Sequence, residues 1–227
     1  MILGVIPARL NSTRFPSKVI FPLKGKPIIE HVYDKALQSD LLSKVIVAVD
    51  SEETKNVINC QNIMMTSDKH QSGTDRVAEV ANNFDCDIVV NIQGDEPGID
   101  PLLIDQLITL FDDPNVEMAS IASTDLQEDD LNNDNVVKVN LDKENNAISF
   151  VRNNLNPDLT YYRHIGIYAY RKNTLNLFTS LSQSDNEKNH RLEQLRALDN
   201  NIAIKLLISD FSHRSIDVKE DLKNYEN

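Results

Sequence analysis

Cations gather directly after the first apolar segment of the chain. Residues 1–6 are apolar and rich in β-branched side chains, which is typical of a short buried strand. Arg9, Arg14 and Lys18 follow this segment in a stretch that also carries prolines. A buried strand that leads into a basic loop places the loop at the carboxyl edge of a parallel sheet, where open α/β proteins bind ligands. These residues predict a site for a polyanion such as a triphosphate, the alternative being a solvated basic loop.

Carboxylates follow two later apolar segments. Asp95 lies in Gln93-Gly94-Asp95-Glu96-Pro97, after the predicted strand 88–92. A carboxylate that faces a basic loop suits Mg²⁺, which takes carboxylate, phosphate and water oxygens. We therefore expect Asp95 to be a metal ligand, with Glu96 as an alternative ligand or as a helix cap. Asp217 follows the last apolar segment and is either a second metal ligand or the N-cap of a terminal helix.

A segment of small polar residues opens the helix predicted over 72–83. In Gln71-Ser72-Gly73-Thr74, the glycine lets a ligand approach the backbone closely. Hydroxyl groups near a helix N-terminus suit the binding of a base or a phosphate, although a plain helix cap is the alternative. The sequence contains neither a G-x-G-x-x-G run after a strand nor a P-loop motif, which disfavours dinucleotide-binding and P-loop enzymes.

Two polar groups of residues lie in the second half. His164, Gly166 and Tyr168 alternate along a predicted strand and share one of its faces, which suits a sugar pocket or a half-exposed strand. Glu193 and Gln194 fall in a helix predicted over 188–198, where such residues are ordinarily solvated.

Composition excludes several classes of protein. The 227 residues carry a formal net charge of −12, which argues against nucleic acid or an anionic membrane surface as the main partner. No apolar run is long enough to span a membrane, and the first segment is too short for a signal peptide. The two cysteines, Cys60 and Cys86, are too few for a disulfide framework. We expect a cytoplasmic protein.

Strand and helix patterns alternate through the first half of the chain. Strands are predicted at 45–49, 63–65 and 88–92, and helices at 27–38, 72–83 and 101–111. This alternation predicts an α/β fold with a mostly parallel sheet covered on both faces. Later strands at 118–123, 136–141, 147–151, 165–171 and 202–208 predict a mixed extension of that sheet. No repeat or clean boundary is visible, so a single domain over 1–227 is expected.

Five segments, in order, resemble the sugar cytidylyltransferases, and specifically the 3-deoxy-manno-octulosonate cytidylyltransferase (CMP-Kdo synthetase) family. The first loop, 7–18, is shared with other nucleotidyltransferases. The other four are more specific: Gln71 to Thr74, Gln93 to Pro97, His164 to Tyr168 and Leu192 to Arg196. The resemblance spans nearly the whole chain. It implies a three-layer sandwich like that of the nucleotide-diphospho-sugar transferases, with a mixed, mostly parallel central sheet.

The resemblance also implies an activity: CTP and the acidic sugar Kdo give CMP-Kdo and pyrophosphate, for lipopolysaccharide synthesis. It assigns catalysis to Lys18, Arg9 and Asp95, and a magnesium ion to Asp95 and Asp217. The implied nucleotide-binding residues are Arg9, Arg14, Lys18, Gln71, Ser72, Gly73, Thr74 and Gln93. The implied sugar-binding residues are Arg152, His164, Tyr168, Glu193 and Gln194. The family further implies a homodimer, with the sugar pocket and dimer surface mainly from about 118–200.

Some positions depart from the family pattern. Ser17 and Val19 flank the loop lysine where glycine and proline are usual, and the segment 152–162 is short. These departures leave the identity of the sugar open. The alternatives are a cytidylyltransferase for 8-amino-Kdo or another acidic sugar, and a nucleotide-binding module without catalysis.

Overall fold

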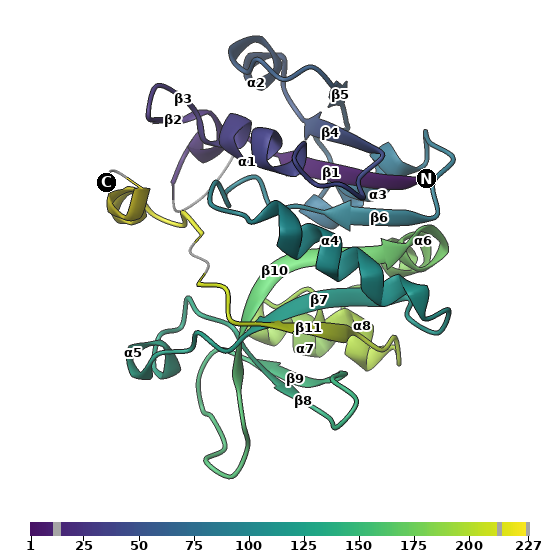
Figure 1. Cartoon of the computed structure of the whole chain (residues 1–227), viewed down its shortest axis with the longest axis vertical. Coiled ribbons are helices and arrows are strands. Elements are labelled where there is room, and N and C mark those ends of the chain that lie inside the picture. The colour runs from purple at the N-terminus through teal and green to yellow at the C-terminus, as the bar shows by residue number, and fades with distance from the viewer. Residues whose placement is uncertain (11–14, 213–214, 226–227) are drawn as a thin grey trace. The chain divides into compact units, whose positions relative to one another are not determined.

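A computed structural model describes residues 1–10, 15–212 and 215–225, and the chain divides into two compact units. The first unit comprises 1–105 with the C-terminal segment 213–227, and the second comprises 106–212. Figure 1 shows the course of the chain through both units. The expectation of a single domain over 1–227 stays a prediction.

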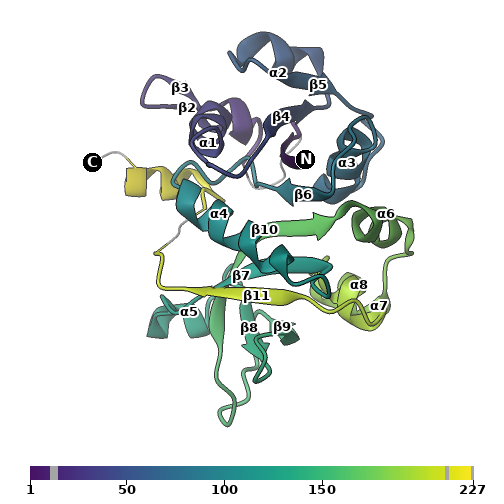
Figure 2. The ribbon, with the colours of Figure 1, turned by 45° about the vertical axis from the view of Figure 1, so that its right-hand side comes forward.

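The first unit is built on four parallel strands in the order β6-β1-β4-β5. Its core includes Val5, Ile6, Val47 and Val89, whose side chains are buried. Figure 2 shows helices α1 and α3 on opposite sides of these strands. The elements are β1 (Ile2–Ala8), η1 (Lys18–Ile20), β2 (Pro22–Leu23), β3 (Lys26–Pro27), α1 (Ile28–Ala36), β4 (Lys44–Val49), α2 (Glu52–Val57), β5 (Ile63–Met65), α3 (Gly73–Ala81), β6 (Ile88–Asn91) and the C-terminal η3 (Lys219–Tyr225).

The second unit carries a mixed set of strands. Strand β11 runs parallel to β7, whereas β10 runs antiparallel to β7 and to β8, and β8 pairs with β9 as a hairpin. The elements are β7 (Met118–Ser123), α5 (Glu128–Leu131), β8 (Lys138–Leu141), β9 (Ala147–Val151), β10 (Tyr162–Arg171), α6 (Lys172–Ser180), α7 (Asp185–His190), α8 (Leu195–Asp199) and β11 (Lys205–Ser209). Helix α4 (Pro101–Thr109) and η2 (Leu110–Asp112) precede β7 in the chain.

The predicted α/β class and the mixed, mostly parallel strands are confirmed. The single helix predicted over 188–198 is wrong. Helix α7 ends at His190, and Arg191 adopts a left-handed conformation with φ 53°, so a second helix begins only at Leu195. A non-glycine residue in that conformation interrupts the helical hydrogen bonds, and this break places Glu193 and Gln194 in the connection between two helices.

Among the described residues, no helix combines the length and the apolar character needed to cross a membrane.

Candidate active site

Lys18, Asp95 and Asp217 form one cluster in the first unit. The Lys18 ammonium is buried, donates a hydrogen bond to Asp95 Oδ2 and lies 3.8 Å from Asp217 Oδ1. Burying an ammonium is costly unless carboxylates or other acceptors surround it. The two aspartates meet that need, so the cluster is a pair of carboxylates that converge on one cation.

The backbone around Lys18 and Asp217 fixes this geometry. Ser17 adopts a left-handed conformation with φ 56° and starts the short helix η1, which carries Lys18. At the other end of the chain, the N–H of Ile216 donates to the carbonyl of Asp95 at 3.0 Å. Asp221 Oδ2 accepts the backbone N–H groups of Asp217, at 2.7 Å, and Val218, at 2.9 Å. Asp221 therefore caps this terminal turn and leaves the Asp217 carboxylate to contact Lys18.

The donor set of this cluster fits Mg²⁺. Asp95 and Asp217 supply carboxylate oxygens that already surround a cation in the form of Lys18 Nζ. Within the described part of the chain, no group of three or more His, Cys, Asp or Glu side chains is arranged to hold a metal. Magnesium commonly takes one or two carboxylates and completes its shell with water and substrate phosphates. Two protein carboxylates are consistent with that pattern.

Two glycines lie close to Pro7 of β1. A Cβ atom at Gly94 would lie 3.0 Å from the carbonyl oxygen of Pro7, and one at Gly73 would lie 3.4 Å from Pro7 Cγ. The contact at Gly94 is with backbone and is tight for a side chain, whereas the contact at Gly73 is close to an ordinary van der Waals distance. The segments before Asp95 and at the start of α3 therefore both approach the end of the first strand.

The segment 71–74 leads into α3, which begins at Gly73, one residue after the predicted start. Ser72 caps the helix by accepting the N–H of Asp75 at 3.1 Å, and the Asp75 carboxylate accepts the N–H of Ser72 in return. Just before it, His70 is hydrogen-bonded to Glu79, which also accepts the N–H of Ser67 at 2.9 Å. The segment 67–72 is therefore hydrogen-bonded to two side chains of α3, those of Glu79 and Asp75.

The remaining predicted nucleotide residues differ in placement. Arg9 is exposed at the end of β1, Gln71 is exposed, and Thr74 is buried in α3. Gln93 is half-buried beside Asn91, and its Nε2 lies 3.5 Å from Asn91 Oδ1. Arg14 lies outside the described residues.

Asp50 and Arg76 are neighbours of the site that sequence reasoning missed. Asp50 Oδ1 accepts the N–H of Leu10 at 3.2 Å, and the buried Arg76 donates to Asp50 Oδ2 at 3.3 Å and to Thr66. Burial lowers the pKa of Arg76, against the opposing effect of the nearby Asp50. The pair anchors the chain just after β1. The sequence did contain an indication of Asp50, because this residue directly follows β4 and so lies at the same sheet edge as the basic loop.

The predicted sugar residues His164 and Tyr168 lie together on β10 in the second unit. Their ring centroids are 5.5 Å apart, and Phe150 packs edge-on against His164 at 5.0 Å. Burial is the main cause that lowers the pKa of His164 to about 3, and the positive charge of the nearby Arg152 adds to it, so the ring is neutral. Burial, followed by Glu193, raises the pKa of Tyr168. Both side chains therefore act as neutral hydrogen-bonding groups.

Arg152 follows β9, and hydrogen bonds from two side chains hold it in place. Its guanidinium donates to the carbonyl of Asp134 at 2.8 Å and to that of Arg191 at 3.4 Å. The fully buried Lys138 donates to the Arg152 carbonyl and, at 2.9 Å, to the Asn133 carbonyl. Burial lowers the pKa of Lys138. The negative charges of Asp130 and Asp134 act in the opposite direction and raise it. Lys138 escaped sequence reasoning because a single lysine in a strand carries no signal of burial.

Glu193 and Gln194 are held beside a buried ion pair. Arg196 donates two hydrogen bonds to Glu187, from Nε at 2.8 Å and from Nη2 at 2.6 Å. The same guanidinium lies 3.6 Å from Glu193 Oε1 and 4.8 Å from the centroid of the Phe178 ring. Gln194 is buried, contrary to the usual expectation for such residues on a helix. The pair fixes the connection between α7 and α8.

Comparison with known proteins identifies relatives over nearly the entire chain. The family model described as "Cytidylyltransferase" matches residues 3–206. The 3-deoxy-manno-octulosonate cytidylyltransferase of Trichlorobacter lovleyi is 39% identical over 240 residues, which cover 97% of this chain and 95% of the relative. That of Chloroherpeton thalassium is 41% identical over 234 residues, which cover 96% of this chain and 93% of the relative.

Solved structures agree with these sequence matches. The structure of CMP:2-keto-3-deoxy-manno-octonic acid synthetase complexed with CTP superimposes with a TM-score of 0.91 at 33% identity, covering 98% of this chain and 95% of that one. A putative glucose-1-phosphate thymidylyltransferase from Bacillus anthracis gives a TM-score of 0.69 at 16% identity, covering 99% of this chain and 94% of that one, and shows a shared fold.

Proposed function

The chain belongs to the cytidylyltransferase family, among the 3-deoxy-manno-octulosonate cytidylyltransferases, and we propose that it transfers CMP from CTP to Kdo and releases pyrophosphate. The observation that carries this proposal is the convergence of Lys18, Asp95 and Asp217 in a chain with relatives of this activity over nearly its full length. The product would serve the assembly of lipopolysaccharide, as the family resemblance implies.

The reaction is an in-line attack of the anomeric hydroxyl of the sugar on the α-phosphate of CTP. Positioning and charge neutralisation supply most of the catalysis in such transfers, because the protein forms no covalent bond. Lys18 and Arg9 stabilise the negative charge on the pyrophosphate that leaves. Gln71 to Thr74, with Gln93, hold the nucleotide at the start of α3.

The second unit recognises the sugar in this proposal. Arg152 offers a guanidinium fork that suits a carboxylate. His164 and Tyr168 offer neutral polar groups, and Glu193 and Gln194 offer acceptors and donors for hydroxyls. The hydrogen bonds of Arg152 to the carbonyls of Asp134 and Arg191 support this role, because they orient the guanidinium before a ligand arrives.

Magnesium is part of the proposal, and Asp95 and Asp217 would hold it. When bound, the ion neutralises phosphate charge and lowers the pKa of the attacking hydroxyl. Lys18 Nζ contacts both carboxylates, so the lysine that would stabilise the leaving pyrophosphate lies beside the residues that would hold the ion.

Pyrophosphate release tests the proposal directly. The purified protein is incubated with CTP, MgCl₂ and either Kdo or 8-amino-Kdo, alongside Asp95→Ala and the control Asp85→Asn, whose side chain is exposed in the same unit. Release with Kdo that Asp95→Ala abolishes and Asp85→Asn retains is the expected result. Release with only the amino sugar would make the protein a cytidylyltransferase for that sugar, and CTP binding without release would make it a non-catalytic nucleotide-binding module.

We further propose that the enzyme acts as a homodimer in the cytoplasm. The family resemblance supports the dimer, and the buried thiols Cys60 and Cys86 suit a reducing compartment. Burial raises the pKa of Cys60 to about 12, which keeps that thiol unreactive. Light scattering coupled to size exclusion tests the dimer, and a mass of 25.7 kDa, that of one chain, would contradict it.

A further inference from the structure

The hydroxyl of Ser120 lies at the centre of a hydrogen-bond cluster that includes His164. Ser120 is fully buried on β7, and its Oγ lies 2.8 Å from the carbonyl oxygen of Ile167, 3.2 Å from that of Ile165 and 3.0 Å from His164 Nε2. A hydroxyl has one hydrogen to donate and two lone pairs to accept with. The three neighbours therefore cannot all be acceptors of comparable strength.

The local backbone decides which neighbour receives that hydrogen. The register of β10 against β7 shifts between Ile165 and Ala169, so more than one residue of β10 lies opposite Ser120. Carbonyl oxygens in such an irregular stretch accept hydrogen bonds only, whereas an imidazole nitrogen can carry its own hydrogen. The shortest contact, at 2.8 Å, goes to the Ile167 carbonyl, so the Ser120 hydrogen points there and a lone pair faces His164 Nε2.

We propose that Ser120 holds His164 as the Nε2–H tautomer, so that Nδ1 is an acceptor for a hydroxyl group of the sugar substrate. In a neutral imidazole one nitrogen donates and the other accepts, and the hydrogen bond at one nitrogen sets the state of the other. Nε2 donates to Ser120 here. Within the described residues, no side chain or backbone group hydrogen-bonds Nδ1, and His164 as a whole residue keeps some exposure to solvent.

This assignment rests on the proposed function, which supplies the sugar as the ligand. It adds that the sugar hydroxyl donates the hydrogen bond and His164 Nδ1 accepts it. His164 would select a sugar that presents a donor at this position and would disfavour one that presents only an acceptor, because the two lone pairs would repel. Ser120 touches the ring and not the sugar, so it is a positioning residue. The low pKa of His164 is consistent with a neutral ring at physiological pH.

Nitrogen NMR of the full-length protein labelled with ¹⁵N-histidine reads the tautomer without any need for activity. The chain has five histidines, and the signals of His164 are assigned with His164→Gln. We expect a protonated Nε2 and an unprotonated Nδ1 at neutral pH. In Ser120→Ala the spectrum should move toward a mixture of the two tautomers. A protonated Nδ1, or a doubly protonated ring, in the unaltered protein would overturn the proposal.

Steady-state kinetics test the consequence for the sugar. We expect Ser120→Ala to raise KM for Kdo by roughly 3- to 10-fold, the range for one neutral hydrogen bond, while KM for CTP stays unchanged. The matched control is Ser123→Ala, which removes a second fully buried hydroxyl of β7 that donates to the Phe211 carbonyl at 2.9 Å. Ser123→Ala should lower the free energy of unfolding by a similar amount but should leave both the His164 signals and KM for Kdo unchanged.

The outcomes separate this inference from the proposed function. Equal effects of the two serine variants on KM for Kdo, or an unchanged His164 spectrum in Ser120→Ala, would overturn the role of Ser120. Failure of the unaltered protein to release pyrophosphate with CTP and either acidic sugar would overturn the sugar half of the inference together with the proposed function. In that case the ¹⁵N spectrum still decides the tautomer.

Discussion

The backbone N–H of Ile216 donates a hydrogen bond to the carbonyl of Asp95 at 3.0 Å. This bond connects the C-terminal segment to the loop after β6, and it brings the residue next to Ile216, Asp217, into the same cluster as Asp95. Ile216 is itself buried among Phe15, Leu23 and Ile28. The position of the second carboxylate therefore depends on apolar packing as well as on a hydrogen bond.

Asp221→Ala should weaken the binding of Mg²⁺. Its carboxylate accepts the N–H groups of Asp217 and Val218, so its loss frees the backbone that presents the Asp217 carboxylate. Changes to groups that orient a metal ligand typically cost about 10- to 100-fold in metal affinity or activity. We expect the Mg²⁺ concentration for half-maximal activity to rise by about 10-fold, with saturating MgCl₂ restoring much of the rate. The control is Glu220→Ala, an exposed neighbour, and equal behaviour of the two variants would contradict this role.

Glu187→Ala should destabilise the protein strongly. It removes one partner of a doubly hydrogen-bonded ion pair whose side chains are only 5% and 6% exposed. The guanidinium of Arg196 would then be left without its main acceptor, a change that costs about 3–5 kcal/mol of unfolding free energy. Urea unfolding measures this loss.

A surface pair on the same helix provides the comparison. Lys188 and Asp185 lie 3.8 Å apart, with side chains 54% and 98% exposed. Lys188→Ala should change the unfolding free energy by less than about 0.5 kcal/mol. A loss for Glu187→Ala as small as that for Lys188→Ala would show that the buried pair contributes little.

Glu79 should make stability depend on acidic pH. Burial alone would raise its pKa, but hydrogen bonds from the Ser67 N–H and from His70 outweigh burial and lower the pKa below the ordinary value of 4.5. The stabilisation is present above pH 4.5 and is lost as the pH falls through the lowered pKa of the folded state. Glu79→Gln should therefore lose less stability than the unaltered protein between pH 5 and pH 3.

Urea unfolding at a series of pH values measures this difference. Glu53→Gln serves as the control because Glu53 is exposed in the first turn of α2. A pH profile of Glu79→Gln that superimposes on that of the unaltered protein would contradict a lowered pKa of Glu79 in the folded state.

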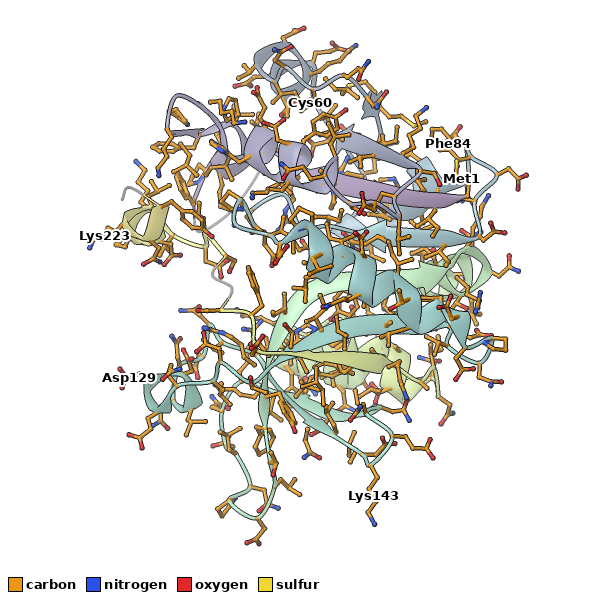
Figure 3. All side chains as sticks on the ribbon, viewed as in Figure 1. Met1, Cys60, Phe84, Asp129, Lys143 and Lys223 are labelled. Carbon is orange, nitrogen blue, oxygen red and sulfur yellow. The ribbon has the colours of Figure 1, made fainter. Side chains whose placement is uncertain are left out.

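Lys138→Met should impair sugar use and leave CTP use intact. It removes the donor to the Arg152 and Asn133 carbonyls while keeping an apolar side chain of similar length. Hydrogen bonds that involve a charged group contribute about 1.5–3 kcal/mol, so KM for Kdo should rise by about 10-fold or more. Lys143→Met is the matched control, since Figure 3 shows the Lys143 side chain extended outward at the β8–β9 turn. A parallel rise in KM for CTP would indicate general damage instead.

Sequence patterns predicted the elements well where one local signal was sufficient. The alternation of apolar runs with helical patterns identified β4, β5 and α3, although it started α3 at Ser72, which is the N-cap of that helix. They failed at Arg191, because a left-handed backbone at a charged residue has no compositional signal in a stretch of helix-forming side chains. The short η1 turn that carries Lys18 is a similar case, since its geometry depends on the conformation of Ser17.

Sequence reasoning predicted which residues belong to the site, but it did not predict the contacts between them. Strand ends placed Asp95 near the basic loop, and the family resemblance favoured the metal-ligand role over the helix-cap role for Asp217. No local pattern indicated that Lys18 lies between those carboxylates, because residues so far apart in the chain meet only through tertiary packing. The supporting residues Ser120, Lys138 and Glu187 share this property: each is buried and each acts through a contact that sequence periodicity does not encode.

The most direct test follows both products by ³¹P NMR in a reaction of CTP, Kdo and MgCl₂. The account predicts equal amounts of pyrophosphate and of a CMP phosphodiester with the sugar, formed by the unaltered protein and slowed by about 100-fold or more in Lys18→Met. Lys55→Met, which alters an exposed lysine of α2, should react normally. Loss of CTP without a CMP–sugar signal, or an unimpaired Lys18→Met, would contradict the role of the Lys18, Asp95 and Asp217 cluster in this transfer.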